Sequence, residues 1–130
     1  MSEDRPDIVT KLSQRSVSDT VARLTSMIDA KGMKLFAVID QSAEARQAGL
    51  SLRETTLVIF GSPKAGTPVM VAEPMVALDL PLKVLVWDDE GQTKVSYYAP
   101  AALAASHHLS ADLAGNLAGI NPLTDALVAG

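Results

Sequence analysis

Residues 55–81 read TTLVIFGSPKAGTPVMVAEPMVALDLP, and this stretch decides how the chain folds. It opens with β-branched threonines and a short unbroken apolar run, Leu57 to Phe60, that ends at Gly61. A run of this length is typical of a strand covered on both faces rather than of a helix. Thr67-Pro68 predicts a helix start, with threonine as the N-cap and proline at the first helical position. The stretch therefore predicts a strand, a loop, a short helix that Pro74 stops or kinks, and a turn into the next strand.

The loop from Gly61 to Thr67 has the glycine spacing of a phosphate-binding P-loop, whose motif is G-x-x-x-x-G-K-[ST]. However, Thr67 stands where the motif needs lysine, and Pro68 where it needs a hydroxyl. Pro63 also removes one of the backbone N–H groups that would line a phosphate cradle. The sequence therefore excludes a P-loop nucleotide hydrolase. A weak anion site at the Thr67 helix start stays open beside the simpler reading of an ordinary capped helix.

Apolar periodicity and chain breakers predict the remaining elements on both sides of this stretch. Toward the N-terminus we expect a strand at 8–12, a helix from Ser16 to Gly32, a strand at 33–39 and a brief helix from Ser42 to Gly49. Toward the C-terminus we expect strands at 82–87 and 93–98 around a polar turn, a helical stripe over 109–120, and a last helix capped by Asn121 with Pro122 first.

This order of elements predicts a single α+β domain over residues 1–130, with residues 1–6 disordered. The strands around the turn at 88–91 form a hairpin, and helices separate the other strands from one another. We therefore expect one mostly antiparallel sheet of about five strands with helices on one face. Because such a sheet leaves its second face free, we expect a homodimer. Trp87, Tyr97 and Tyr98 are then expected in the core or the dimer interface.

Composition narrows the class of protein. The formal net charge is −4 and the basic residues do not cluster, so we expect no nucleic-acid partner. The chain has no cysteine, which excludes disulfides and thiolate chemistry. No apolar run approaches the length of a membrane span, and the N-terminal MSEDRPD lacks the pattern of a signal peptide. We expect a soluble, cytoplasmic protein with no membrane partner and no cofactor.

Three segments carry a resemblance to a known family: FAVIDQSAEARQAGL (36–50), LVIFGSPKAGTPVM (57–70) and ALDLPLKVLVWDDEGQTKVSYYAP (77–100). With them, residues 32–100 resemble the family called domain of unknown function 302. The resemblance implies a TATA-binding-protein-like α+β fold, and it implies no activity. Family members commonly have Asp-His-Ser where this chain has Asp40-Gln41-Ser42. Because glutamine cannot shuttle protons, no role of that histidine carries over.

The titratable residues offer little for catalysis or metal binding. His107 and His108 are the only histidines, and adjacent residues on a helix point in different directions, so we expect a solvated helix end and no metal site. Asp40 and Asp79 follow or precede strands, where two carboxylates brought together would serve acid–base chemistry. The simpler interpretation is that Asp40 caps a helix and Asp79 orders a turn.

We therefore expect no catalytic residues, and three hypotheses about function stay open. The first is a non-catalytic homodimer that binds a small molecule. The second is an enzyme that uses Asp40, Ser42 and Asp79, and the third is a structural or protein-interaction dimer. The candidate ligand-binding residues are Asp40, Gln41, Ser42, Gly61, Pro63, Gly66, Thr67, Met70, Asp79 and Pro81.

Overall fold

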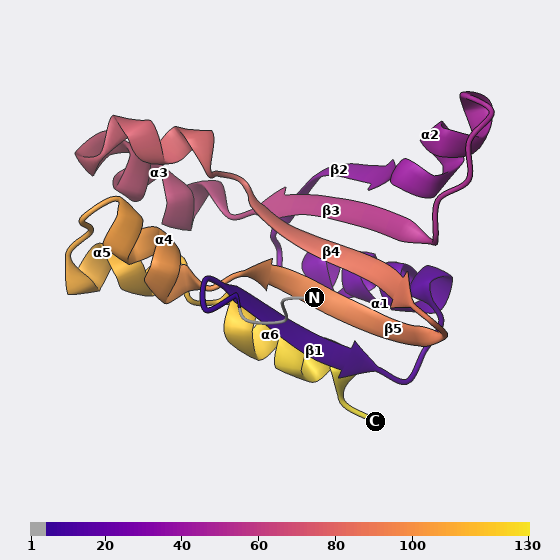
Figure 1. Ribbon diagram of the computed structural model, residues 1–130. Coiled ribbons are helices and arrows are strands. Elements are labelled where there is room, and N and C mark those ends of the chain that lie inside the picture. The colour runs from indigo at the N-terminus through magenta and orange to yellow at the C-terminus, as the bar shows by residue number, and fades with distance from the viewer. Residues whose placement is uncertain (1–4) are drawn as a thin grey trace.

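Five strands form one antiparallel sheet in the order β1-β5-β4-β3-β2 in a computed structural model that describes residues 5–130 (Figure 1). Most of the predicted disordered segment, residues 1–4, therefore lies outside the described residues. The strands are β1 (Ile8–Ser13), β2 (Lys34–Asp40), β3 (Thr55–Gly61), β4 (Leu82–Asp89) and β5 (Gln92–Tyr98). The helices are α1 (Val17–Ala30), α2 (Gln41–Gln47), α3 (Pro63–Ala72), the 3₁₀ helix η1 (Pro74–Leu78), α4 (Pro100–Ser106), α5 (Ala111–Gly115) and α6 (Ile120–Val128). The predicted α+β class and antiparallel sheet are confirmed.

Helices α1 and α6 cover one face of the sheet, the face turned away from the viewer in Figure 1. On β3, Thr56, Val58 and Phe60 point into this layer and are buried. Leu57 and Ile59 alternate with them on the other face, where they are half-buried. The prediction that this apolar run is covered on both faces is therefore wrong, because no helix of the described chain covers the second face.

Helix α1 follows the local signals of the sequence. Ser16 caps it by accepting a hydrogen bond from the Asp19 backbone N–H at 3.0 Å. Leu24 and Ile28, one turn apart on the inner stripe, are fully buried. The helix ends before Gly32, whose φ of 70° lies in the left-handed region that favours glycine. The prediction for this segment is confirmed.

Two helix starts differ from the prediction. Helix α3 begins at Pro63 rather than at Thr67-Pro68, because Ser62 caps it and Pro63 occupies the first turn. Pro68 lies inside the helix, where it costs the hydrogen bond that its backbone nitrogen would donate to the Lys64 carbonyl. Pro74 does end α3, as predicted.

Helix α6 begins at Ile120, one residue before the predicted Asn121-Pro122 cap. The Asn121 side chain is occupied elsewhere, since it accepts a hydrogen bond from the Tyr97 hydroxyl at 2.8 Å. The stripe expected over 109–120 is not one helix. His108, with a φ of 53°, separates α4 from α5, and α5 ends at Gly115.

Helices α3, α4 and α5 lie together beyond one end of the sheet (Figure 1). Val69, Val76 and Leu117 form a second buried apolar cluster there, separate from the core between the sheet and helices α1 and α6. The junction of these two clusters is the place to look for a site. Among the described residues, no helix is both long and apolar enough to cross a membrane.

Candidate ligand-binding site

A cavity of about 350 Å³ lies at this junction, between the end of the sheet and helix α3. Segments far apart in the chain build its walls: the start of β2, the end of β3, the first turns of α3, the turn into β4 and the segment that leads into α6. The lining residues are Met33, Phe36, Phe60, Gly61, Ser62, Pro63, Ala65, Gly66, Met70, Leu80, Pro81, Leu82, Asn116, Leu117, Gly119 and Ile120. Phe36 and Pro63 are exposed to solvent, so the cavity opens beside them.

The walls are almost entirely apolar. None of the residues that line the cavity carries an ionisable side chain. The two polar side chains among them are already engaged in the fold. Ser62 accepts from the Ala65 N–H at 3.3 Å, and Asn116 donates to the Ala65 carbonyl at 3.1 Å. The cavity is therefore suited to contact with hydrocarbon, and no ionisable side chain lines it.

Two glycines leave space in the walls. A Cβ atom built at Gly66 would stand 3.9 Å from the Leu80 Cδ1 and Met70 Cε atoms, and one at Gly61 would stand 3.6 Å from the Pro81 Cβ atom. These are ordinary van der Waals distances, so neither glycine is needed to avoid a clash. Their missing side chains instead widen the cavity.

Half of the residues predicted from the sequence line this cavity: Gly61, Pro63, Gly66, Met70 and Pro81. Thr67 is exposed on α3 and is not part of the lining. Asp40, Gln41 and Ser42 lie at the other end of β2, at the start of α2.

Asp40 acts as the N-cap of α2. Its carboxylate accepts from the Ser42 hydroxyl at 2.6 Å and from the Ala43 N–H at 2.9 Å. These hydrogen bonds, with the Ser42 hydroxyl first, hold the pKa of Asp40 below its ordinary value. The Ser42 hydroxyl also accepts from the Thr55 N–H at 3.3 Å, so the segment fastens α2 to β3.

The structure does not bring Asp40 and Asp79 together. The sheet register places Asp40 level with Thr56 and Val86, four residues along β4 from its start at Leu82. That offset corresponds to about 13 Å of strand, and Asp79 comes before β4 begins. The carboxylate pair that the enzyme hypothesis requires is not formed.

Asp79 instead pairs with His107, a contact that no local pattern in the sequence indicates. The His107 Nε2 and Asp79 Oδ2 atoms are 2.6 Å apart, which ties the end of α4 to the turn after η1. The His107 side chain is 14% exposed, so the expectation of a solvated helix end is wrong for this residue. Within the described residues, no group of His, Asp and Glu side chains has the arrangement of a metal site.

Comparison with known proteins gives the chain its family. The family model described as a domain of unknown function, DUF302, matches residues 9–127. The crystal structure of an uncharacterized conserved DUF302 protein from Bacillus stearothermophilus has a TM-score of 0.81 with 18% identity, covering 95% of this chain and 97% of that one. At that identity the likeness shows a shared fold.

Curated relatives carry a different kind of name. A protein of Brucella suis biovar 1 (strain 1330) named fluoride-specific ion channel FluC 1 is 39% identical over 110 residues, which are 82% of this chain and 43% of that protein. Its namesake from Brucella abortus biovar 1 (strain 9-941) is also 39% identical, over 41% of its length. This chain thus spans about two fifths of the curated relatives it matches.

The predicted family resemblance, placed on residues 32–100, is confirmed and extends beyond both ends of that segment. Because the family model covers most of the chain, this protein belongs to the DUF302 family.

Proposed function

We propose that this protein is a non-catalytic module that binds one small apolar molecule in the cavity at the end of the sheet, and that it acts as a homodimer. The observation that carries the proposal is a cavity of about 350 Å³ whose lining has no ionisable side chain. Ligand pockets are mostly apolar and range from about 300 to 1,000 Å³. This cavity lies at the small end of that range, which favours a small ligand.

The walls also have the means to adapt to a ligand. Met33 and Met70 line the cavity, and methionine side chains are flexible and polarizable. Rigid residues, Pro63 and Pro81, frame the same space. The site therefore combines a fixed frame with adjustable contacts.

The enzyme hypothesis has less support. Asp40 caps α2 at the far end of β2 and accepts a hydrogen bond from Ser42, and Asp79 pairs with His107. A general base needs to lie within hydrogen-bonding reach of the proton it removes. No residue of the cavity lining meets that requirement, so the proposal is one of binding without turnover.

A matched pair of variants tests the binding proposal. Gly66→Leu places a side chain beside Leu80 and Met70, whereas Thr67→Leu adds the same side chain at the exposed neighbouring position. We expect Gly66→Leu to weaken binding of the neutral fluorescent probe N-phenylnaphthylamine by about tenfold or more, since overfilling a packed site is unfavourable. Thr67→Leu should bind like the wild type. Equal probe binding by all three proteins would place the probe elsewhere and reject the cavity as the site.

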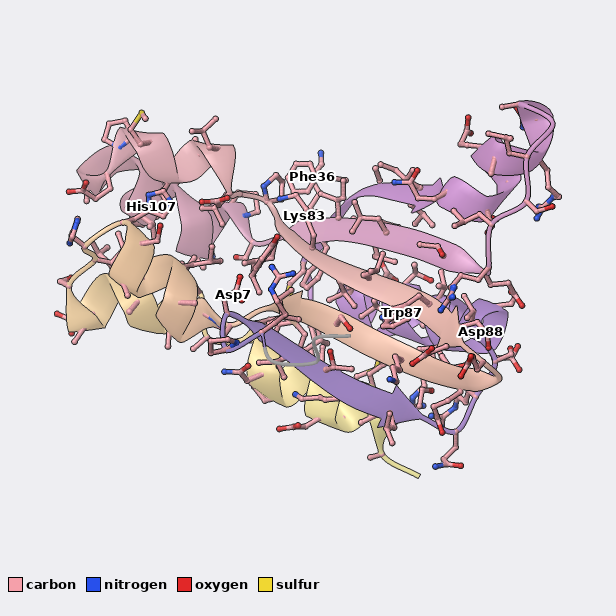
Figure 2. All side chains as sticks on the ribbon, in the orientation of Figure 1. Asp7, Phe36, Lys83, Trp87, Asp88 and His107 are labelled. Carbon is pink, nitrogen blue, oxygen red and sulfur yellow. The ribbon has the colours of Figure 1, made fainter. Side chains whose placement is uncertain are left out.

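The homodimer proposal is supported by the uncovered face of the sheet. Leu57, Ile59, Leu85 and Trp87 lie side by side at its centre and are half-buried without any helix over them. Figure 2 shows Trp87 on this face. A second copy of the chain, packed face to face, would remove these side chains from water.

The curated relatives favour a second candidate function. They are named fluoride-specific ion channels, and this chain matches about two fifths of their length. The second proposal is that the module accompanies such a channel and modulates it. Fluoride tolerance of source cells that lack this protein tests the idea. We expect cells that lack the protein to tolerate less fluoride and the wild-type protein to restore their tolerance. Unchanged tolerance in cells that lack it would reject the second proposal.

A further inference from the structure

We infer that the ligand is an amphipathic monoanion, with the chemistry of a medium-chain carboxylic acid, whose head group binds between Lys34 and Lys83 while its apolar chain fills the cavity. The inference rests on the proposed binding function and adds the class of ligand. It starts from the placement of these two lysines beside residues that line a cavity without ionisable side chains.

Each lysine contacts a residue of the cavity lining. The Lys34 Nζ atom lies 5.5 Å from the centroid of the Phe36 ring, and the Lys83 Nζ atom donates a hydrogen bond to the Pro81 carbonyl at 3.1 Å. Phe36 and Pro81 both line the cavity, and Phe36 marks its opening. Each ammonium group therefore lies next to a residue that lines the cavity.

The sheet register puts both lysines on the same face. Lys34 pairs with Gly61 across β2 and β3, and Lys83 pairs with Ile59 across β3 and β4. Gly61 and Ile59 are two residues apart, and residues at that spacing share a face of a strand. Gly61 adds no side chain at its position on this face, and the Pro81 Cβ and Phe36 Cε2 atoms lie 3.6 and 3.8 Å from where its Cβ atom would stand. Figure 2 labels Phe36 and Lys83 at this end of the sheet.

Within residues 5–130, neither of these two lysines has an acidic partner. Lys11 and Lys94 form ion pairs with Asp125 and Asp89, but among the described residues no carboxylate lies within ion-pairing distance of Lys34 or Lys83. An ammonium group has three N–H donors, and the Pro81 carbonyl uses one of those on Lys83. Donors therefore remain on each lysine for an anionic oxygen.

The net negative charge of the chain strengthens the argument that these two lysines form a local site for an anion. The net charge of −4 repels anions in general, so an anion gains only where positive charges are concentrated. The start of α3 adds to this concentration, since Ser62 and Pro63 line the cavity and a helix N-terminus carries a partial positive charge. An apolar cavity with a positive opening matches a molecule that has one apolar end and one negative end.

The test compares two probes of the same chain length, decanoate and decanol, by isothermal titration calorimetry. The wild type should bind decanoate about tenfold more tightly than decanol, with the difference shrinking as salt is raised. Lys34→Gln and Lys83→Gln should each weaken decanoate binding by about 3- to 10-fold and leave decanol unchanged. Arg46→Gln, which removes a positive charge from α2 at the other end of β2, is the matched control and should change neither affinity.

The possible results distinguish a failure of the anionic head group from a failure of the proposed apolar binding site. If decanoate and decanol bind equally and the lysine variants alter neither, the anionic head group is wrong and the apolar site stands. If neither probe binds the wild type, both the inference and the proposed function fail. If Arg46→Gln weakens decanoate as much as the lysine variants do, only the overall charge matters, and the assignment to Lys34 and Lys83 is overturned.

Discussion

At Gly66, a missing side chain both weakens a helix and keeps a cavity open. The residue lies within α3, where glycine is a poor helix former, yet its Cα faces Leu80 and Met70 across free space. Asp40 shows the opposite balance at the other end of β2, because its carboxylate is committed to capping α2. At the scale of single residues, Gly66 lowers the stability of its helix and enlarges the cavity, whereas Asp40 only stabilises its helix.

Gly66→Ala is expected to stabilise the protein by about 0.5–1 kcal/mol, the usual gain of alanine over glycine within a helix. The added Cβ atom would meet its neighbours at 3.9 Å, so no strain offsets the gain. Urea denaturation followed by circular dichroism measures the change. A loss of stability would show that the wall of the cavity cannot accept one more carbon.

Asp40→Asn is expected to reduce the change of the free energy of unfolding with pH under acidic conditions. Hydrogen bonds from Ser42 and Ala43 lower the pKa of Asp40 in the folded state from its ordinary 3.8. The unfolded state therefore takes up a proton first, so this stabilisation is complete above that ordinary value and is lost as the pH falls through the lower folded pKa. The measurement is the free energy of unfolding from about pH 5 to pH 2. Asp29→Asn, at the exposed end of α1, is the control, and an equal effect there would contradict the assignment.

At the scale of elements, a buried polar network joins β1, β5 and α6. The Thr124 hydroxyl of α6 lies 2.6 Å from the Lys11 Nζ atom of β1 and 3.2 Å from the Tyr97 hydroxyl of β5. Asn121 of α6 accepts from the same tyrosine at 2.8 Å. The helix is thus fixed to two strands by hydrogen bonds as well as by apolar packing.

Thr124→Val should destabilise the protein by about 1–3 kcal/mol. The variant removes the fully buried Thr124 hydroxyl, and Lys11 then has one hydrogen-bond acceptor fewer inside the fold. Valine has nearly the same shape, so the loss reports the hydrogen bonds and not a void. Thr25→Val on α1 is the matched control, since its hydroxyl contacts only a carbonyl of its own helix. Chemical denaturation compares the two variants, and equal small losses would mean that the network contributes little.

Elements with a local signature were predictable from the sequence, and contacts between distant elements were not. The β4–β5 hairpin and α1 are where their turn and cap residues indicate. The start of α3 was misplaced because Ser62-Pro63 and Thr67-Pro68 carry the same cap-then-proline signature, and only packing selects the first.

The residues of the candidate site also fall into two groups, those that local sequence patterns predict and those that they do not. Gly61, Pro63 and Gly66 were predictable because they follow one another within one short segment of the sequence. Phe36 and Asn116 were missed, because they reach the cavity from β2 and from the segment before α6, and nothing near them in the sequence indicates that meeting. His107 was missed as the partner of Asp79 for the same reason.

At the scale of the whole molecule, the sheet has one face in the core and one face uncovered. Leu57 and Leu85 pair directly across β3 and β4 on the uncovered face, with Trp87 beside them. The Trp87 Nε1 atom donates to the Ser96 hydroxyl at 3.0 Å, which holds the indole ring against the sheet. The uncovered face is therefore an ordered apolar surface of the kind that interfaces between subunits bury.

If the proposed homodimer forms through this face, Leu57→Glu is expected to convert it into a monomer without unfolding it. A carboxylate at the centre of the interface would be buried without a partner, which should weaken association by about 100-fold or more. Native mass spectrometry and light scattering measure the mass. Val71→Glu, on the exposed side of α3, adds the same charge away from the sheet and should remain dimeric. A monomeric wild type would reject the homodimer.

The strand order also sets the sequence of events in folding. Ile8 of β1 pairs with Tyr98 of β5, so the earliest strand cannot enter the sheet until the latest one exists. The core then closes only when Leu123 and Leu127 of α6, near the end of the chain, pack against it. Contacts this distant in sequence are slow to form. During synthesis, β1 therefore has no strand partner until β5 has been made, and the core around α1 stays incomplete until α6 follows.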